Sequence, residues 1–147
     1  MDLSPDEDNF QGRLLHQAAL WDNVELLQEL LANGADVNAR DALNRTALHA
    51  AALAERSSCL KALCAAGADI DAVSSPANGG KTALHIAAER GHVENTRVLL
   101  ARGACPTDGD GSGDSALALA EQGARRSTAA LLRERREKSK QPVFCYK

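Results

Sequence analysis

Apolar residues recur along the chain in short blocks with helical spacing. Residues 14–19 place leucine and alanine on one face of a helix of about two turns, and residues 48–52 repeat the pattern. A longer apolar stripe follows the first block in residues 24–31, where Val24, Leu27 and Leu30 are spaced three apart. The pattern predicts two-turn inner helices, each followed by a longer second helix. Because alanine lets helices approach closely, we expect the inner helices to pack side by side.

A tetrapeptide marks the repetition. Thr-Ala-Leu-His occupies residues 46–49 and returns at residues 82–85, with weaker forms at 13–16 and 115–118. The fourth positions of these blocks are separated by 33, 36 and 33 residues. The three extra residues of the middle interval fall in residues 74–80, a stretch rich in Ser, Gly and Pro that is typical of a loop.

A second motif follows the first three blocks at a constant distance. It reads Leu-Leu-Ala-Asn-Gly-Ala-Asp-Val-Asn-Ala at residues 30–39 and recurs in altered form at 63–72 and 99–106. Each copy has a glycine where a left-handed residue would end the second helix, namely Gly34, Gly67 and Gly103. Two motifs in the same phase indicate a repeat architecture, in which each interior repeat contacts only its two neighbours.

These motifs resemble the ankyrin repeat. The resemblance covers about residues 8–137 and implies an α-helical repeat solenoid of helix-turn-helix pairs with short β-hairpin fingers. We expect four repeats, at about residues 8–40, 41–73, 74–109 and 110–137, and a fourth repeat that serves as an end cap because it lacks the histidine and the closing glycine motif. The Gly-His turn of the family is intact only at residues 91–92. Asn38 matches an asparagine that is hydroxylated in some members.

Composition and charge fit this interpretation. The 28 alanines and 20 leucines of the 147 residues predict a core of small aliphatic side chains in one domain. Residues 1–123 hold 9 Lys/Arg and 18 Asp/Glu, whereas residues 124–147 hold 8 and 2. We therefore expect an acidic N-terminal segment at 1–7 and a basic tail at 138–147. No basic-then-apolar leader and no apolar run of about 20 residues is present, so we expect a cytoplasmic or nuclear protein.

Candidate chemistry is sparse. His16, His49 and His85 hold equivalent places in successive repeats, about 8–10 Å apart, which is too far to share one zinc ion. The resemblance implies that each imidazole binds finger backbone. An acidic stretch at 108–114 is similar to part of a calcium loop but lacks its last glutamate, which favours a polar finger loop. The four cysteines form no C-x-x-C pair and are expected to be reduced. We expect no enzyme activity, no metal and no cofactor.

The resemblance also implies where a partner binds, namely at the finger tips and the concave ends of the inner helices. Aligned on the repeated tetrapeptide, these positions are Phe10, Leu20, Trp21, Ala42, Leu43, Arg45, Leu53, Ala54, Lys81, Glu89, Arg90, Ser112, Asp114 and Gln122. Five of them form an apolar group with the composition of an interface hot spot. These are Phe10, Leu20, Trp21, Leu43 and Leu53. The alternative is that Trp21 or Phe10 covers the core at the end of the stack.

The sequence therefore predicts a monomeric protein-binding module, acting as an adaptor or as a stoichiometric regulator of another protein. The alternative is a nuclear transcription or chromatin cofactor that uses the basic tail. Nucleic acid is not an expected partner of the acidic body, and no membrane contact is expected. The tail itself is open to two interpretations. It is either a solvated helix end, or a functional segment that serves in nuclear import, binds an anionic surface or folds back to inhibit partner binding.

Overall fold

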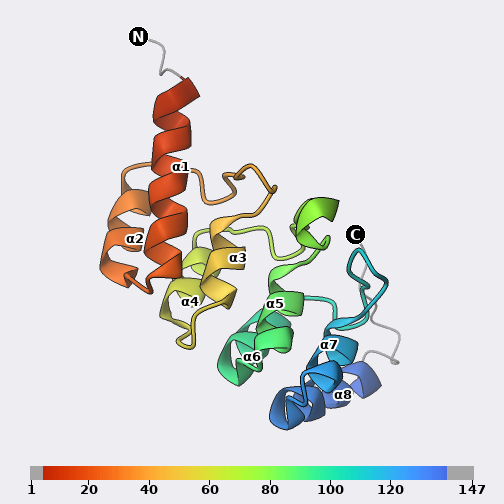
Figure 1. Cartoon of the computed structure of the whole chain (residues 1–147). Coiled ribbons are helices and arrows are strands. Elements are labelled where there is room, and N and C mark those ends of the chain that lie inside the picture. The colour runs from red at the N-terminus through yellow and green to blue at the C-terminus, as the bar shows by residue number, and fades with distance from the viewer. Residues whose placement is uncertain (1–4, 139–147) are drawn as a thin grey trace.

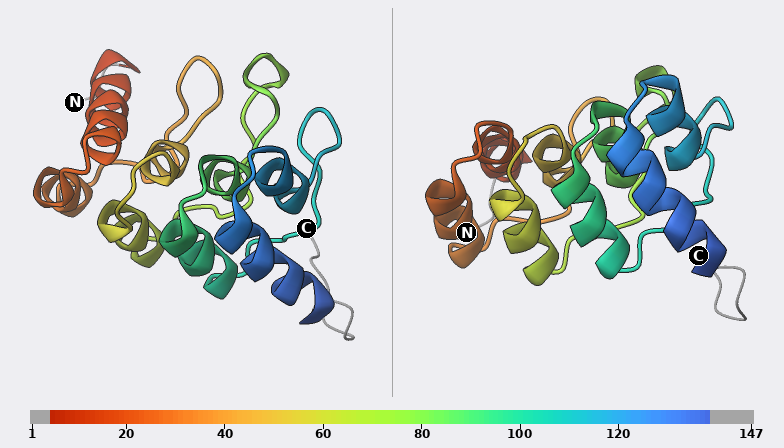
Figure 2. Two further views of the ribbon diagram at one scale, coloured as in Figure 1. Left: turned by 60° about the horizontal axis from the view of Figure 1, so that its bottom comes forward. Right: turned by 90° about the horizontal axis from the view of Figure 1, so that it is seen from below.

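The computed structural model describes the backbone of residues 5–138 and the side chains of residues 11–135. Over this part of the chain the protein is a stack of four helix pairs, as Figures 1 and 2 show. The pairs are α1 (Pro5–Leu20) with α2 (Val24–Ala32), α3 (Ala47–Ala52) with α4 (Ser58–Ala65), α5 (Ala83–Arg90) with α6 (Val93–Ala101), and α7 (Ala116–Gln122) with α8 (Arg126–Lys138). The predicted helical solenoid is confirmed.

The helices form two rows. The inner row is α1, α3, α5 and α7, and the outer row is α2, α4, α6 and α8, with each helix packed on the next one in its row. The predicted two-turn length holds for α3, α5 and α7 but is wrong for α1, which has 16 residues. Its additional residues begin at Pro5, because proline is tolerated at the first helical position and acidic residues follow it in the sequence.

The inner helices α3, α5 and α7 begin directly after the hydroxyl residue of the repeated tetrapeptide, which is their N-cap. Thr82 caps α5, its Oγ1 accepting the His85 N–H at 3.3 Å while its own N–H donates to His85 Nδ1 at 3.2 Å. Thr46 N–H donates in the same way to His49 Nδ1 at 3.0 Å. These reciprocal bonds satisfy donors that every helix start leaves unpaired, which is why the motif recurs.

The second helices end as predicted. Gly34, Gly67 and Gly103 have φ values of 91°, 93° and 95°. At the first of them, Gly34 N–H binds Leu31 O at 3.1 Å and Ala35 N–H binds Leu30 O at 3.0 Å. This pair of bonds satisfies the last carbonyls of α2, and it requires the left-handed backbone that glycine adopts without steric cost.

Three finger loops, at residues 34–46, 67–82 and 103–115, project from the same side of the stack (Figure 2). The β-hairpins implied for them are not seen in the described residues, apart from one isolated antiparallel bridge between Gly109 and Ser115. The second loop contains the inserted stretch, which forms a short 3-10 helix at Pro76–Asn78. Its Gly80, at φ 58°, lies so close to the third loop that a Cβ there would be 3.0 Å from Gly111 N.

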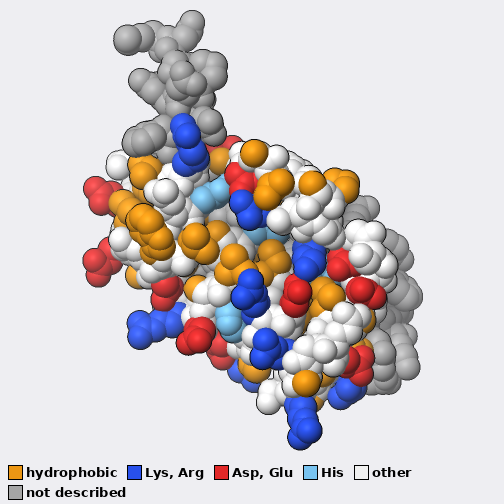
Figure 3. Space-filling model, in the orientation of Figure 1, with side chains coloured by type: hydrophobic (Ala, Val, Ile, Leu, Met, Phe, Trp, Pro, Cys, Tyr) orange, Lys and Arg blue, Asp and Glu red, His pale blue; other side chains and the backbone are white. Residues whose placement is uncertain are grey.

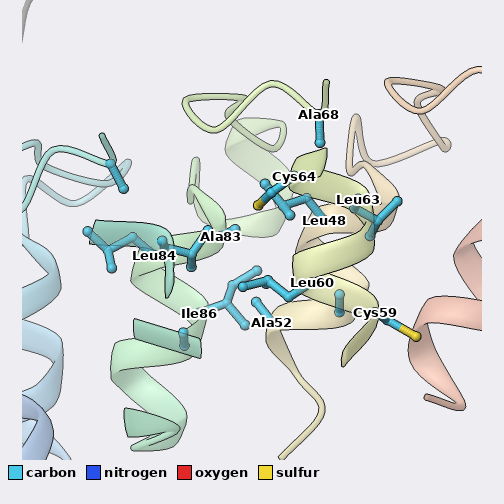
Figure 4. Packing of buried hydrophobic residues seen from close by; sticks show 14 of the residues in the cluster. Leu48, Ala52, Cys59, Leu60, Leu63, Cys64, Ala68, Ala83, Leu84 and Ile86 are labelled. Atoms are coloured by element: carbon cyan, nitrogen blue, oxygen red, sulfur yellow. The ribbon is translucent and has the colours of Figure 1, made fainter. Parts of the chain in front are cut away.

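The core is built from leucine and alanine, as the composition predicts. Leu48, Leu60, Leu63 and Leu84 are almost fully buried, and Figure 4 shows Leu60 and Ala52 turned toward the third repeat. Alanines on the inner row keep the helices close enough for these leucines to bridge successive repeats. Ala129 and Leu132 of α8 are buried in the same core, so α8 packs onto the stack through α6 and α7.

Two expectations concern termini and membranes. No helix within the described residues combines the length and apolar character needed to cross a bilayer. Arg133 pairs with Glu121 of α7, and Arg135 donates to Leu100 O of α6, which ties the second half of α8 to both helices. Residues 1–4 of the predicted acidic segment (1–7) and residues 139–147 of the predicted basic tail (138–147) lie outside the described residues, as does Cys145. Cys59, Cys64 and Cys105 are buried free thiols.

Candidate functional site

The three histidines at equivalent repeat positions, which we call the phased histidines (His16, His49 and His85), are all hydrogen-bonded within the scaffold. Nε2 of each ring bonds a finger-loop carbonyl, at 3.1 Å for His16 to Ala39 O, 2.8 Å for His49 to Lys81 O and 2.9 Å for His85 to Asp108 O. In His49 and His85 the other nitrogen accepts a backbone N–H, so the neutral ring protonated on Nε2 fits the network. Burial lowers the pKa of both, against the opposing effect of the bonds to Lys81 and Asp108.

The acidic stretch of the third finger loop is held by its own backbone. Asp110 Oδ1 accepts the N–H groups of Ser112 at 2.9 Å and Asp114 at 3.0 Å, which is the polar loop that the sequence favoured. Among the described residues, no group of three or more His, Cys, Asp or Glu side chains is placed to hold a metal ion.

A groove of about 400 Å³ opens on the concave side of the first three repeats, between α1, α3, α5 and the first two finger loops. We call it the inner groove. It is lined by His16, Gln17, Leu20, Asp41, Arg45, Thr46, His49, Ala50, Leu53, Asn78, Lys81, Ile86, Glu89 and Arg90. Figure 3 shows hydrophobic and charged side chains meeting on the face formed by these helices.

The inner groove has an apolar floor contributed by three successive inner helices. Leu20 ends α1 and is 50% exposed, Ala50 and Leu53 are half-buried at α3, and Ile86 of α5 is nearly buried. Apolar side chains that remain wet at the bottom of a concave surface are available to a ligand, because their burial releases water.

The rim of the inner groove is charged and mostly paired. Arg45 Nε bonds Asp41 Oδ2 at 2.7 Å within the first finger loop, and Lys81 Nζ bonds Glu89 Oε2 at 2.6 Å between the second loop and α5. Burial alone would raise the pKa of Asp41, but hydrogen bonds from the Arg45 backbone and guanidinium bring it below its usual value. The rim therefore carries charges fixed in position by the finger loops.

Sequence comparison supports the same architecture. Two family models described as ankyrin repeats match the chain, one over residues 15–64 and the other over residues 66–141. The chain belongs to the ankyrin-repeat family. Ankyrin repeats are generally protein–protein interaction modules and are typically non-catalytic. A search of curated proteins found no match.

The structure brings together six of the fourteen positions at which the ankyrin resemblance places a partner. Leu20, Arg45, Leu53, Lys81, Glu89 and Arg90 line the inner groove. Leu43 and Asp114 lie in the first and third finger loops, outside the groove lining, and the side chain of Phe10 lies outside the described residues.

Trp21 follows Leu20 directly at the end of α1, and its side chain is 67% exposed. Trp21 is therefore not part of the buried core of this ankyrin stack. We call Leu20 and Trp21 the edge pair: Leu20 lines the inner groove, and Trp21 is the exposed residue that directly follows it.

Sequence reasoning missed part of the groove. Ile86 directly follows the phased His85, at the place that Gln17 and Ala50 hold in the earlier ankyrin repeats. Its size is the signal that could have found it, since the repeat pattern does not require a large residue there. Asn78 comes from the inserted stretch of the second finger loop, which has no counterpart in the other repeats.

Proposed function

We propose that the chain binds a segment of another protein in the inner groove, as an adaptor or as a stoichiometric regulator of that partner. Membership of the ankyrin-repeat family supports a protein-binding role, and the exposure of the edge pair supports the inner groove as the binding surface. Leu20 and Trp21 are 50% and 67% exposed beside a concave apolar floor. Exposed aromatic and aliphatic side chains grouped at a groove have the character of interface hot spots.

Removal of the edge pair tests this proposal. Full-length Leu20→Gln/Trp21→Gln should lose specific partners captured by the wild-type chain from cell extract, as measured by quantitative mass spectrometry. Both side chains are at least half exposed, so the variant should lose less than about 1 kcal/mol of folding free energy.

Ala65→Gln/Ala66→Gln is the matched control. These two alanines are also adjacent, exposed and at the end of a helix, but they lie on α4 in the outer row. The control should retain the captured partners. Equal capture by both double variants would contradict binding at the inner groove.

A further inference from the structure

The two acids of the inner groove are engaged within the protein, whereas one of its cations is not. The carboxylate of Asp41 already accepts two backbone N–H groups and the Nε of Arg45. Glu89 accepts from Lys81. Arg90 is exposed and makes no hydrogen bond or ion pair with any residue that the structure describes. The acids of the rim are thus engaged within the protein, whereas the guanidinium of Arg90 is available.

The surface also changes character along the stack. The fourth and fifth residues after each phased histidine are Leu20–Trp21, Leu53–Ala54 and Glu89–Arg90. Their order runs from apolar at the first two repeats to charged at the third. A ligand lying along the groove therefore meets apolar side chains at one end and an unpaired cation at the other.

We propose that the groove selects an acidic–apolar peptide segment of the partner, with apolar side chains on Leu20 and Leu53 and an aspartate or glutamate on Arg90. This inference rests on the proposed function and specifies the chemistry of its ligand. Inner helices are about 8–10 Å apart, so the distance from α1 to α5 corresponds to about five to six residues of extended chain. Carboxylate is the natural partner because guanidinium binds it in a bidentate manner.

A basic ligand fits the same groove poorly. The chain's own residues 139–147 contain two lysines and no aspartate or glutamate, so they offer no acidic side chain to Arg90. The body as a whole is acidic, so it is pairing with Arg90 in particular that favours an acidic residue in the bound segment.

Selection from a random dodecapeptide phage library on the full chain tests this inference. We expect the enriched peptides to combine Asp or Glu with a large apolar residue several positions away. The best peptides, synthesised with a fluorophore, would then be titrated by fluorescence polarisation. Enrichment of basic peptides, or of apolar peptides without an acid, would overturn the proposal.

Charge reversal at Arg90, compared with the same change at an arginine outside the groove, tests the role of Arg90 in peptide binding. Arg90→Glu should weaken binding of the acidic peptides by about 10- to 100-fold, the range expected for loss of a charged hydrogen bond. Arg102→Glu makes the same change at an exposed residue near another helix end, the C-cap of α6 outside the groove, and should leave binding within about twofold of wild type.

The outcomes separate this inference from the proposed function. Binding that is lost in Leu20→Gln/Trp21→Gln but equal in Arg90→Glu and Arg102→Glu would leave the groove as a protein site and refute the acidic ligand. Two results would refute both the acidic ligand and the groove as a protein site. One is that the peptides bind Leu20→Gln/Trp21→Gln as tightly as the wild-type chain, and the other is that no peptide is enriched on the wild-type chain relative to this variant.

Discussion

We expect Asn95→Asp to lower the free energy of unfolding by about 4 kcal/mol at pH 7, because it places an ionised carboxylate in a buried site facing carbonyl oxygens. Asn95 lies in α6 with no exposed surface. Its Nδ2 donates to Ala54 O at 2.6 Å and lies 3.4 Å from Ala51 O. The substitution replaces that donor by a charged acceptor, which the low-polarity site cannot solvate.

The second repeat explains why the stability of the protein depends on Asn95. Its turn between helices is one residue longer than the others when counted from the phased histidine, and it lacks the Gly-His pair. Carbonyls at the end of α3 and in the turn after it accept hydrogen bonds from side chains of the third repeat. Besides Asn95, His92 donates through Nδ1 to Ala52 O at 3.2 Å. The third repeat therefore caps a helix of the second, and loss of this cap weakens the contact between them.

Urea denaturation at several pH values measures this effect. The difference between Asn95→Asp and wild type should shrink as the pH falls toward 5, because the introduced carboxyl takes up a proton and regains a donor. Asn23→Asp is the control, since Asn23 is the exposed N-cap of α2, where aspartate is equally suitable. A loss below about 1 kcal/mol, or one independent of pH, would contradict the assigned cap.

Acid should destabilise the wild-type protein well above the range in which carboxylates titrate. His49 and His85 are buried and neutral in the folded chain, with lowered pKa values, whereas in the unfolded chain they take up protons near pH 6.5. The unfolded state therefore binds more protons below about pH 6.5, and stability decreases as the pH falls from there through the folded-state pKa values. Each histidine contributes a slope of up to about 1.4 kcal/mol per pH unit.

Urea denaturation between pH 7.5 and 5.5 checks this expectation. His85→Gln should lower the stability at pH 7.5 but roughly halve the dependence on pH, because one of the two titrating rings is gone. A wild-type free energy of unfolding that is constant over this interval would mean that the rings are protonated equally in both states. The network through Thr82 and Asp108 would then be wrong.

Much of the fold was predictable because two motifs with a common period constrain it. The hydroxyl residue and histidine of the tetrapeptide define where an inner helix begins, and Gly34 and its equivalents define where a second helix ends. The extent of α1 was not predictable from the repeat, since residues before the first motif are outside its period. The hairpins implied by the family were also not seen, because the finger loops close mainly through turns and side-chain bonds such as those of Asp41.

The groove was predictable where a residue occupies a variable position of the repeat, as Leu53 and Arg90 do. It was not predictable where a contact joins different repeats. Asn95 takes the place that Leu60 holds in the second repeat, counted from the N-cap of each helix, and the sequence gives no indication that α3 needs an external donor. Such contacts depend on the precise distance between neighbouring helices, which residue patterns do not specify.

Photocrosslinking in cells tests most directly whether the concave side of the first three repeats is the surface that binds a partner. Benzoylphenylalanine would replace Leu53 at the floor of the inner groove or, in a second variant, Lys61 on the exposed side of α4. Our account predicts a discrete higher-mass adduct from position 53 and none from position 61. An adduct formed at position 61 but not at position 53 would contradict it.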